Sequence, residues 1–102
     1  MYGVVRCYQG ASQLFDVLEQ RKSDVEALLR GVPGFIAYNL IRSGDGGASI
    51  TFCQDQAGTA ESTRLAAGWV RENVPATASS PPQVTEGEVI LQFWADQSGA
   101  AR

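Results

Sequence analysis

Histidine is absent from this chain of 102 residues. Its absence excludes nucleophiles activated by histidine, zinc sites built on imidazole, and haem held by a proximal histidine. The two cysteines, Cys7 and Cys53, are too few for a four-ligand zinc site. Because each lies in a predicted strand, they favour buried, reduced thiols over a disulfide framework. We therefore expect a protein that uses neither a metal nor a bound cofactor.

Long apolar runs and clusters of basic residues are also missing. No uninterrupted apolar segment approaches the roughly 20 residues that span a membrane. The eight Lys and Arg residues are scattered and the net charge is −3, so the chain lacks the basic stripe that a nucleic-acid backbone requires. The first residues, MYGVVRCYQG, match neither a secretory signal nor a transit peptide. We expect a cytoplasmic protein that binds neither nucleic acid nor membrane.

The stretch VPGFIAYNLIRSGDGGASITFCQD, residues 32–55, predicts a β-hairpin. Its two halves, Phe35–Arg42 and Ala48–Gln54, are rich in the β-branched and aromatic residues that favour strands. The SGDGG segment between them supplies the glycine and aspartate residues that tight turns demand. The rest of the fold should be arranged around this hairpin.

Two further strands and two helices are predicted on either side of the hairpin. Before it, the composition of YGVVRCY predicts a strand over Tyr2–Tyr8. Apolar residues at three- and four-residue steps then predict one helix over Ser12–Arg30, with its first serine as the N-cap. After the hairpin, a helix is expected over Thr59–Asn73 and a strand over Val84–Ala95.

The order of these elements is that of a ferredoxin-like βαββαβ domain, an α+β fold. We expect one domain over residues 1–95, followed by a flexible tail over 96–102. Right-handed crossovers place both helices on one face of a four-stranded antiparallel sheet. Apolar residues nevertheless point to both faces of the strand Val84–Ala95. A second copy of the chain could cover the remaining face, so we expect a homodimer.

The segment VPGFIAYNLIRSGDGG and the pattern SxxxAxxWV around Trp69 resemble a known family, the dimeric α+β barrel proteins, in particular small proteins of the antibiotic biosynthesis monooxygenase (ABM) type. The resemblance implies two ferredoxin-like sheets packed as a homodimeric barrel, with one pocket per subunit between sheet and helices. Such proteins include haem degraders with an iron-ligating histidine, which this chain lacks, and cofactor-independent oxygenases of polycyclic phenols. It thus implies a cofactor-independent monooxygenase-like protein that binds a small aromatic or polyketide-like molecule. The alternative is a non-catalytic ligand-binding or regulatory dimer.

Seven residues are candidates for contact with a ligand. Two are amides that interrupt apolar runs, four are aromatic, and one is a charge in a central strand: Asn39, Gln92, Tyr8, Tyr38, Trp69, Trp94 and Arg6. A buried amide needs a partner, an exposed edge or a cavity. Buried Tyr and Trp likewise place their polar atoms against a ligand or a backbone group.

Arg6 and Trp69 each allow a structural and a functional interpretation. A guanidinium in a central strand should be paired, either with a carboxylate such as Glu88 or with an anionic ligand. Trp69 lies on the apolar face of its predicted helix, so it either fills the core or forms a pocket wall. A catalytic residue is not identified from the sequence, and no metal ligands are predicted.

Overall fold

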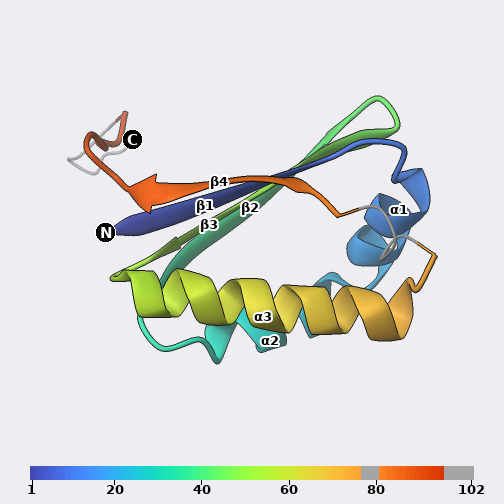
Figure 1. Cartoon of the computed structure of the whole chain (residues 1–102), viewed down its shortest axis with the longest axis horizontal. Coiled ribbons are helices and arrows are strands. Elements are labelled where there is room, and N and C mark those ends of the chain that lie inside the picture. The colour runs from blue at the N-terminus through green and yellow to red at the C-terminus, as the bar shows by residue number, and fades with distance from the viewer. Residues whose placement is uncertain (77–80, 96–102) are drawn as a thin grey trace.

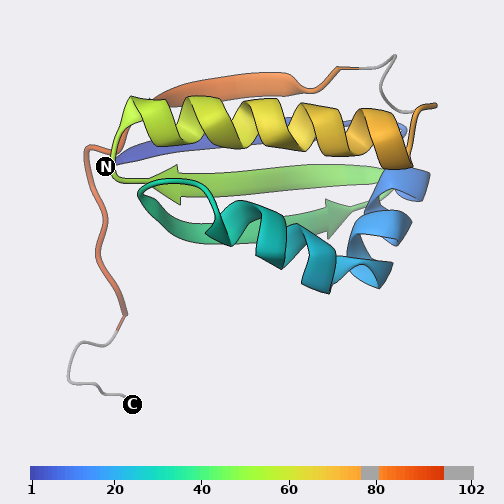
Figure 2. The same cartoon turned by 90° about the horizontal axis from the view of Figure 1, so that it is seen from below.

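Four antiparallel strands form one sheet in the computed structural model, which describes residues 1–76 and 81–95. The strand order is β2-β3-β1-β4, and the helices cover one face (Figures 1 and 2). The elements are β1 (Tyr2–Tyr8), α1 (Ser12–Gln20), α2 (Lys22–Arg30), β2 (Phe35–Ser43), β3 (Gly46–Cys53), α3 (Gln56–Asn73) and β4 (Gln83–Glu88). This arrangement confirms the predicted ferredoxin-like α+β fold. The tail predicted over 96–102 lies outside the described residues.

The first predicted helix is two helices, because the chain breaks at Arg21, where φ is −111° and ψ is 32°. In one continuous helix, Arg21 and Lys22 would lie between Leu18 and Val25 on the core-facing stripe. The break lets both charged side chains reach solvent. The predicted N-cap is also wrong, because Ala11 holds that position and makes no side-chain capping bond.

The hairpin prediction is confirmed, with strands that continue closer to the turn than expected. Gly47 shows why the turn is rich in glycine. Its φ is 152°, and a Cβ built there would lie 2.0 Å from the Ile41 carbonyl oxygen. Any other residue would clash with the backbone of the neighbouring strand.

A β-bulge between Phe35 and Ala37 changes which face Phe35 occupies. Simple alternation would place it opposite Tyr38. Instead it packs toward the helices, in the core cluster around Leu29, Val32 and Cys53. The bulge therefore adds an aromatic side chain to the helix side of the sheet.

Helix α3 begins three residues before the predicted start because Asp55 caps it. The Asp55 carboxylate accepts a hydrogen bond of 3.1 Å from the Gly58 amide. Small residues then let the helix approach the sheet closely. A Cβ on Gly58 would lie 2.7 Å from the Cβ of Cys53. The helix ends at Asn73, as predicted.

The apolar core consists of two clusters on the helix side of the sheet. One contains Leu14 and Phe15 of α1, and the other contains Leu29 and Cys53. Strand register places Arg6 and Ser49 opposite each other between the two clusters. Both are buried, so the layer between helices and sheet has a polar centre.

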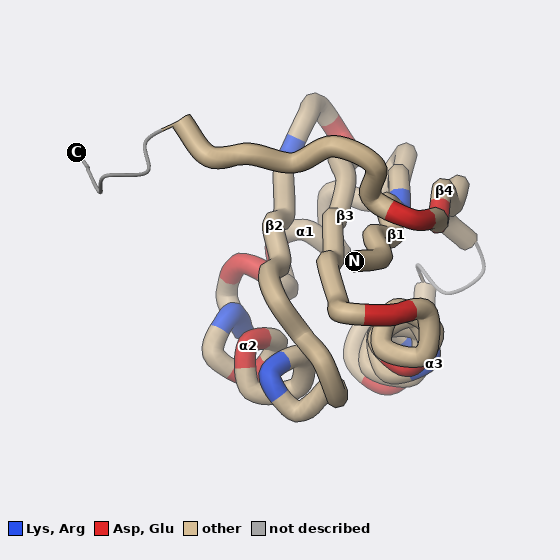
Figure 3. The backbone as a smooth tube through the Cα atoms, turned by 90° about the vertical axis from the view of Figure 1, so that its left-hand side faces the viewer, with Lys and Arg blue, Asp and Glu red and all other residues tan. Residues whose placement is uncertain are grey.

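The strand predicted over Val84–Ala95 is wrong in its second half, because β4 ends at Glu88. Glu88 pairs with Tyr2, and the Val89 amide donates to the Met1 carbonyl at 2.8 Å, so β1 offers no further residue to pair with. Residues 89–95 then leave the sheet on the side opposite the helices (Figures 1 and 3). Four of their apolar side chains are 67–92% exposed: Ile90, Leu91, Phe93 and Trp94.

Candidate functional site

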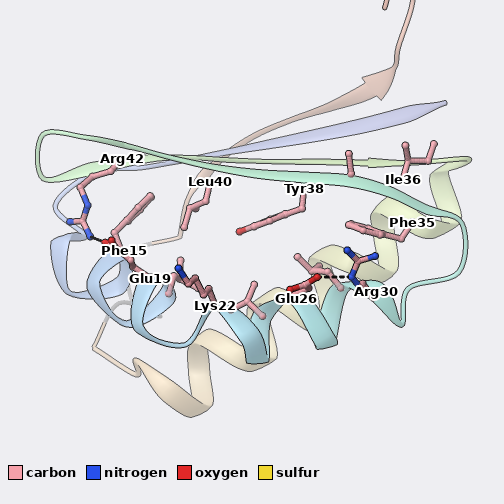
Figure 4. Close-up of a pocket in the computed structure, with 14 residues that line it drawn as sticks. Phe15, Glu19, Lys22, Glu26, Arg30, Phe35, Ile36, Tyr38, Leu40 and Arg42 are labelled. Carbon is pink, nitrogen blue, oxygen red and sulfur yellow. Dashed lines mark hydrogen bonds and ion pairs between the residues drawn. The ribbon is translucent and has the colours of Figure 1, made fainter. Parts of the chain in front are cut away.

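A cavity of about 800 Å³ lies between β2 and the two helices α1 and α2; we call it the outer pocket (Figure 4). Its aromatic walls are Phe15, Phe35 and Tyr38. The Tyr38 ring points from β2 into the space above the helices (Figure 4). The volume lies within the usual range of small-molecule sites.

Charged side chains surround the mouth of the outer pocket. Arg42 of β2 contacts Asp16 and Glu19 of α1 at 3.0 and 3.4 Å, which joins the strand to the helix. Arg30 pairs with Glu26 within α2 at 2.8 Å. These pairs are exposed and contribute little to stability. They give the pocket a polar entrance and leave its walls apolar.

A second, much smaller cavity of about 30 Å³ lies deeper between the sheet and the helices. We call it the inner cavity; its polar and aromatic lining is Arg6, Tyr8, Tyr38, Ser49 and Trp69. Four of the seven candidate residues from the sequence therefore meet at one place. Tyr38 lines both cavities and so connects the outer pocket with Arg6.

Arg6 is only 3% exposed and its hydrogen-bond partners are hydroxyl groups. Its Nη2 donates to Ser62 Oγ at 3.2 Å and to Thr63 Oγ1 at 2.7 Å, while Nη1 is 3.5 Å from Ser49 Oγ. Its Nε has no partner among the described residues. Burial lowers the pKa of Arg6, but a guanidinium remains protonated at neutral pH.

The expected pairing of Arg6 with Glu88 does not form. Register places Glu88 opposite Tyr2 at the end of the sheet, whereas Arg6 lies opposite Val84. The nearer carboxylate, Glu86, accepts a hydrogen bond from the Thr59 hydroxyl instead. Within the described part of the chain, no ion pair involves Arg6. Its positive charge is therefore available to a bound anion or to a developing negative charge.

Two partly buried tyrosines lie beside this cation. Burial raises the pKa of Tyr38 to about 12, although Arg6 and a hydrogen bond with Ser49 act in the opposite direction. Burial also raises the pKa of Tyr8. Both phenols are therefore protonated at neutral pH, and each can donate a hydrogen bond. Ser49 links the Arg6 guanidinium to the Tyr38 hydroxyl.

Trp69 combines the two interpretations left open by the sequence. Its indole lines the inner cavity and also packs against the cluster of Leu14 and Phe15. On its other side, the Arg21 guanidinium lies 5.5 Å from the ring centroid. The side chain is half-buried, so it is a core residue and a cavity wall together.

The structure places the other three candidates away from both cavities. Asn39 is exposed on β2, because alternation turns it away from the helices while Tyr38 faces them. Gln92 and Trp94 lie beyond the end of β4 and are exposed.

Sequence reasoning missed the hydroxyl groups that hold Arg6. Ser49 occupies a helix-facing position in β3, and Ser62 and Thr63 lie on the sheet side of α3. A polar residue at each inward position was a visible signal, but only the pairing of β1 with β3 shows that these residues meet at Arg6. Among the described residues, acidic and cysteine side chains nowhere gather as metal ligands would.

Comparison with known proteins shows the same fold in several solved structures. One is a point mutant of MhuD, a haem degrader of Mycobacterium tuberculosis, solved with two manganese protoporphyrin IX molecules per active site. It matches this chain with a TM-score of 0.65 and 15% sequence identity. The match covers 93% of this chain and 100% of the MhuD chain. NE2512 of Nitrosomonas europaea, a protein of unknown function, matches with a TM-score of 0.65 and 18% identity over 94% of each chain.

A third match is a monooxygenase from the gene ActVA-Orf6 of Streptomyces coelicolor, solved with nanaomycin D. Its TM-score is 0.55, with 19% identity over 93% of this chain and 90% of its own. No protein-family model and no curated protein sequence matches the chain. At these identities the likeness shows the fold alone. The chain therefore has the ferredoxin-like α+β fold of these structures, as its sequence predicted. Among its described residues, no helix has the length and apolar character that a membrane span requires.

Proposed function

We propose that the outer pocket binds a small aromatic or polyketide-like molecule with one ligand oxygen against the Tyr38 hydroxyl. The observation that carries this proposal is the buried guanidinium of Arg6, which makes no ion pair among the described residues and lies behind Tyr38 at the inner end of an apolar pocket. Burying a charge without a counterion is costly unless a ligand or a reaction uses it. A ligand that develops negative charge on its oxygen would do so.

The reaction class we propose is monooxygenation without a bound cofactor. A phenolic or enolic substrate SH₂ would lose a proton and reduce dioxygen itself, in the balance SH₂ + O₂ → S=O + H₂O. All four electrons come from the substrate, so no external reductant is needed. Tyr38 would donate a hydrogen bond to the substrate oxyanion. Arg6 would stabilise the same charge from behind, through Ser49.

Haem suits this pocket poorly. The chain has no histidine, and the described lining of the outer pocket contains no cysteine. Tyr38 is the pocket residue whose phenol oxygen could ligate iron, and that hydroxyl already takes part in a hydrogen bond with Ser49. We therefore derive no step that passes through haem, and the ActVA-Orf6 monooxygenase is the more informative of the similar structures.

The test is a binding titration with 1,8-dihydroxyanthrone, a polycyclic phenol whose ring CH₂ can be oxidised to C=O, followed by measurement of oxygen uptake above the rate without protein. Tyr38→Phe removes the hydroxyl and should weaken binding about threefold to tenfold, the usual worth of one hydrogen bond. Tyr2→Phe is the matched control, because Tyr2 lines neither cavity. Binding without oxygen uptake would favour the non-catalytic alternative. Equal binding by both variants would contradict the proposed site.

We also propose that the working form is a homodimer. Residues 89–95 carry four large apolar side chains that are mostly exposed in one chain. The outer face of the sheet, opposite the helices, adds Ile41, which is 52% exposed, and the half-buried Ile50 and Phe52. An apolar surface of this kind marks a protein interface. A second copy would cover both the sheet face and the segment.

A further inference from the structure

The outer pocket and the inner cavity share one boundary. Four side chains line both: Leu18, Val25, Leu29 and Tyr38. The inner cavity has room for about one water molecule. In this arrangement a ligand in the outer pocket reaches Tyr38 but cannot touch Arg6.

Three of the four boundary side chains belong to the helices on either side of the break. Leu18 lies three residues before Arg21, and Val25 lies four residues after it. The angle between α1 and α2 therefore sets the width of the boundary. Three backbone bonds join the residues at the junction: the Arg21 amide donates to the Val17 carbonyl at 2.9 Å, and the Asp24 and Val25 amides donate to the Arg21 carbonyl at 3.0 and 3.1 Å.

The Arg21 side chain ties this junction to α3. Its Nη1 donates to Asn73 Oδ1 at 2.7 Å and its Nε donates to Asp24 Oδ2 at 2.8 Å. Its guanidinium also lies over the Trp69 ring. Asn73 in turn donates from Nδ2 to the Trp69 carbonyl at 2.9 Å. One side chain thus joins α2, the last turn of α3 and a wall of the inner cavity.

These contacts can be exchanged for water. The side chains of Arg21 and Asp24 are 45% and 56% exposed, so their contacts are individually weak. Leu18 packs against the cluster of Leu14 and Phe15, and Val25 packs against the cluster of Leu29, so the Arg21 side chain adds to apolar contacts on both sides of the break. Opening should cost far less than unfolding.

We propose that Arg21 is a positioning residue that determines how deeply a ligand enters. Bound to Asn73, it holds the boundary closed and stops the ligand at Tyr38. Released from Asn73, it lets α2 move away, so that the two cavities join and a ligand oxygen contacts the Arg6 guanidinium directly. This inference depends on the proposed function, because it requires a ligand in the outer pocket.

The experiment compares Asn73→Leu, which removes the acceptor of Arg21, with Asn73→Asp, which keeps one. Arg64→Gln is the control, because it breaks an exposed ion pair with Glu61 elsewhere on α3. Amide hydrogen exchange of Arg21 and Val25 is measured first, without any ligand. Exchange should become roughly tenfold faster in Asn73→Leu and stay at the parent rate in the other two variants. Equal exchange rates in all variants would contradict the proposal that the contact between Arg21 and Asn73 holds the boundary closed.

The second measurement uses 4-nitrophenol, whose anion is coloured, so its absorbance reports its ionisation in the pocket. Contact with Arg6 should lower the pKa of the bound phenol by about one unit in Asn73→Leu relative to the parent. A merely structural role of Arg21 would leave the pKa of the bound phenol unchanged. That result would contradict the proposal that Arg21 determines how deeply a ligand enters. Exchange could become faster in Asn73→Leu while 4-nitrophenol binds to none of the variants. That result would support the role of Arg21 at the junction and contradict the proposed ligand site in the outer pocket.

Discussion

The helix-facing side of the sheet buries polar side chains, whereas the outer side exposes apolar ones. Folding of an isolated chain favours the reverse. The helix-facing side buries Arg6, Ser49 and Thr51, each at most 4% exposed. The outer side leaves Ile41 half in solvent and continues into the apolar segment 89–95. Polar groups inside and apolar groups outside both cost free energy in an isolated chain. The contrast therefore assigns a site to one face and an interface to the other.

Segment 89–95 allows the strongest test of this comparison. Replacing both Leu91 and Phe93 by serine should convert a dimer into a monomer. In one chain these side chains are 76% and 78% exposed, so their loss changes its own stability by at most about 0.5 kcal/mol. In a two-fold interface four such side chains are lost, a total of about 6 kcal/mol or more. Light-scattering mass over a concentration series measures the change.

The matched control for segment 89–95 is Val84→Ser. Val84 is 48% exposed, but it lies opposite Arg6 on the helix-facing side of β4. This variant should keep the parent mass. If the parent protein is already monomeric at micromolar concentration, the proposed homodimer is wrong. The exposed apolar residues of the outer face would then have no interface to explain them.

The helix-facing side is tested next by Trp69→Ala. The indole packs against the cluster of Leu14 and Phe15, but it also borders the inner cavity and carries Arg21 on its outer side. We expect a loss of about 3 kcal/mol in the free energy of unfolding, at the lower end of the range for a buried aromatic residue. Urea unfolding measures it. A loss below about 1 kcal/mol would show that the ring is a cavity wall only.

Most of the secondary structure was predictable because local patterns determine it. The hairpin turn has glycines where the backbone requires them, and β1 matches its predicted bounds. The break at Arg21 had a signal as well, since two charged residues occupy core-facing positions of the apolar stripe. The end of β4 had no signal in the residues of β4 itself, because the position of this end depends on the length of β1.

The candidate site was predictable in its residue types but not in its grouping. Arg6, Tyr8, Tyr38 and Trp69 meet at the inner cavity. Asn39 faces the opposite way, which follows from strand alternation once the neighbouring bulge is known. The hydroxyl partners of Arg6 come from β3 and α3, and such contacts between distant segments depend on register and packing rather than on local pattern.

A pH titration then tests the partly buried phenols of Tyr8 and Tyr38 on the helix-facing side. Because the pKa of Tyr38 is about 12 in the folded chain and near its ordinary 10 in the unfolded chain, its contribution to stability is complete below about pH 10. That contribution is lost as the pH rises from 10 toward 12, because the unfolded chain releases the Tyr38 proton in this range while burial keeps it on the folded chain. We expect a fall of about 2 kcal/mol, reduced somewhat by partial exposure.

Tyr38→Phe should remove most of this alkaline fall, whereas Tyr2→Phe should leave it in place. Tyr8 contributes in the same direction, since burial raises its pKa too. Urea unfolding of the three proteins over the alkaline range provides the comparison. An identical fall in Tyr38→Phe and the parent would show that the ring is ionised as easily as in water, and the inner end of the pocket would then be wet.

The smallest expected effect on stability comes from Arg6→Met, and it bears most directly on the contrast between the faces. Methionine has a similar length and no charge to desolvate. Ser62 and Thr63 already donate to the Thr59 carbonyl, so they lose only a donor from Arg6. The free energy of unfolding should therefore stay the same or rise by about 1 kcal/mol. Binding of a phenolate ligand should be lost, because the cation that attracts it is gone.

Arg42→Met is the comparison variant for Arg6→Met. Arg42 makes exposed ion pairs with Asp16 and Glu19, and its guanidinium lies 5.9 Å from the Phe15 ring centroid, so its replacement should cost a few tenths of a kcal/mol to about 1 kcal/mol. An ordinary surface arginine is thus expected to stabilise the fold more than the buried one. If instead Arg6→Met lowered stability by more than about 2 kcal/mol, the guanidinium would be a structural link between β1, β3 and α3. The polar centre beneath the helices would then need no ligand to explain it.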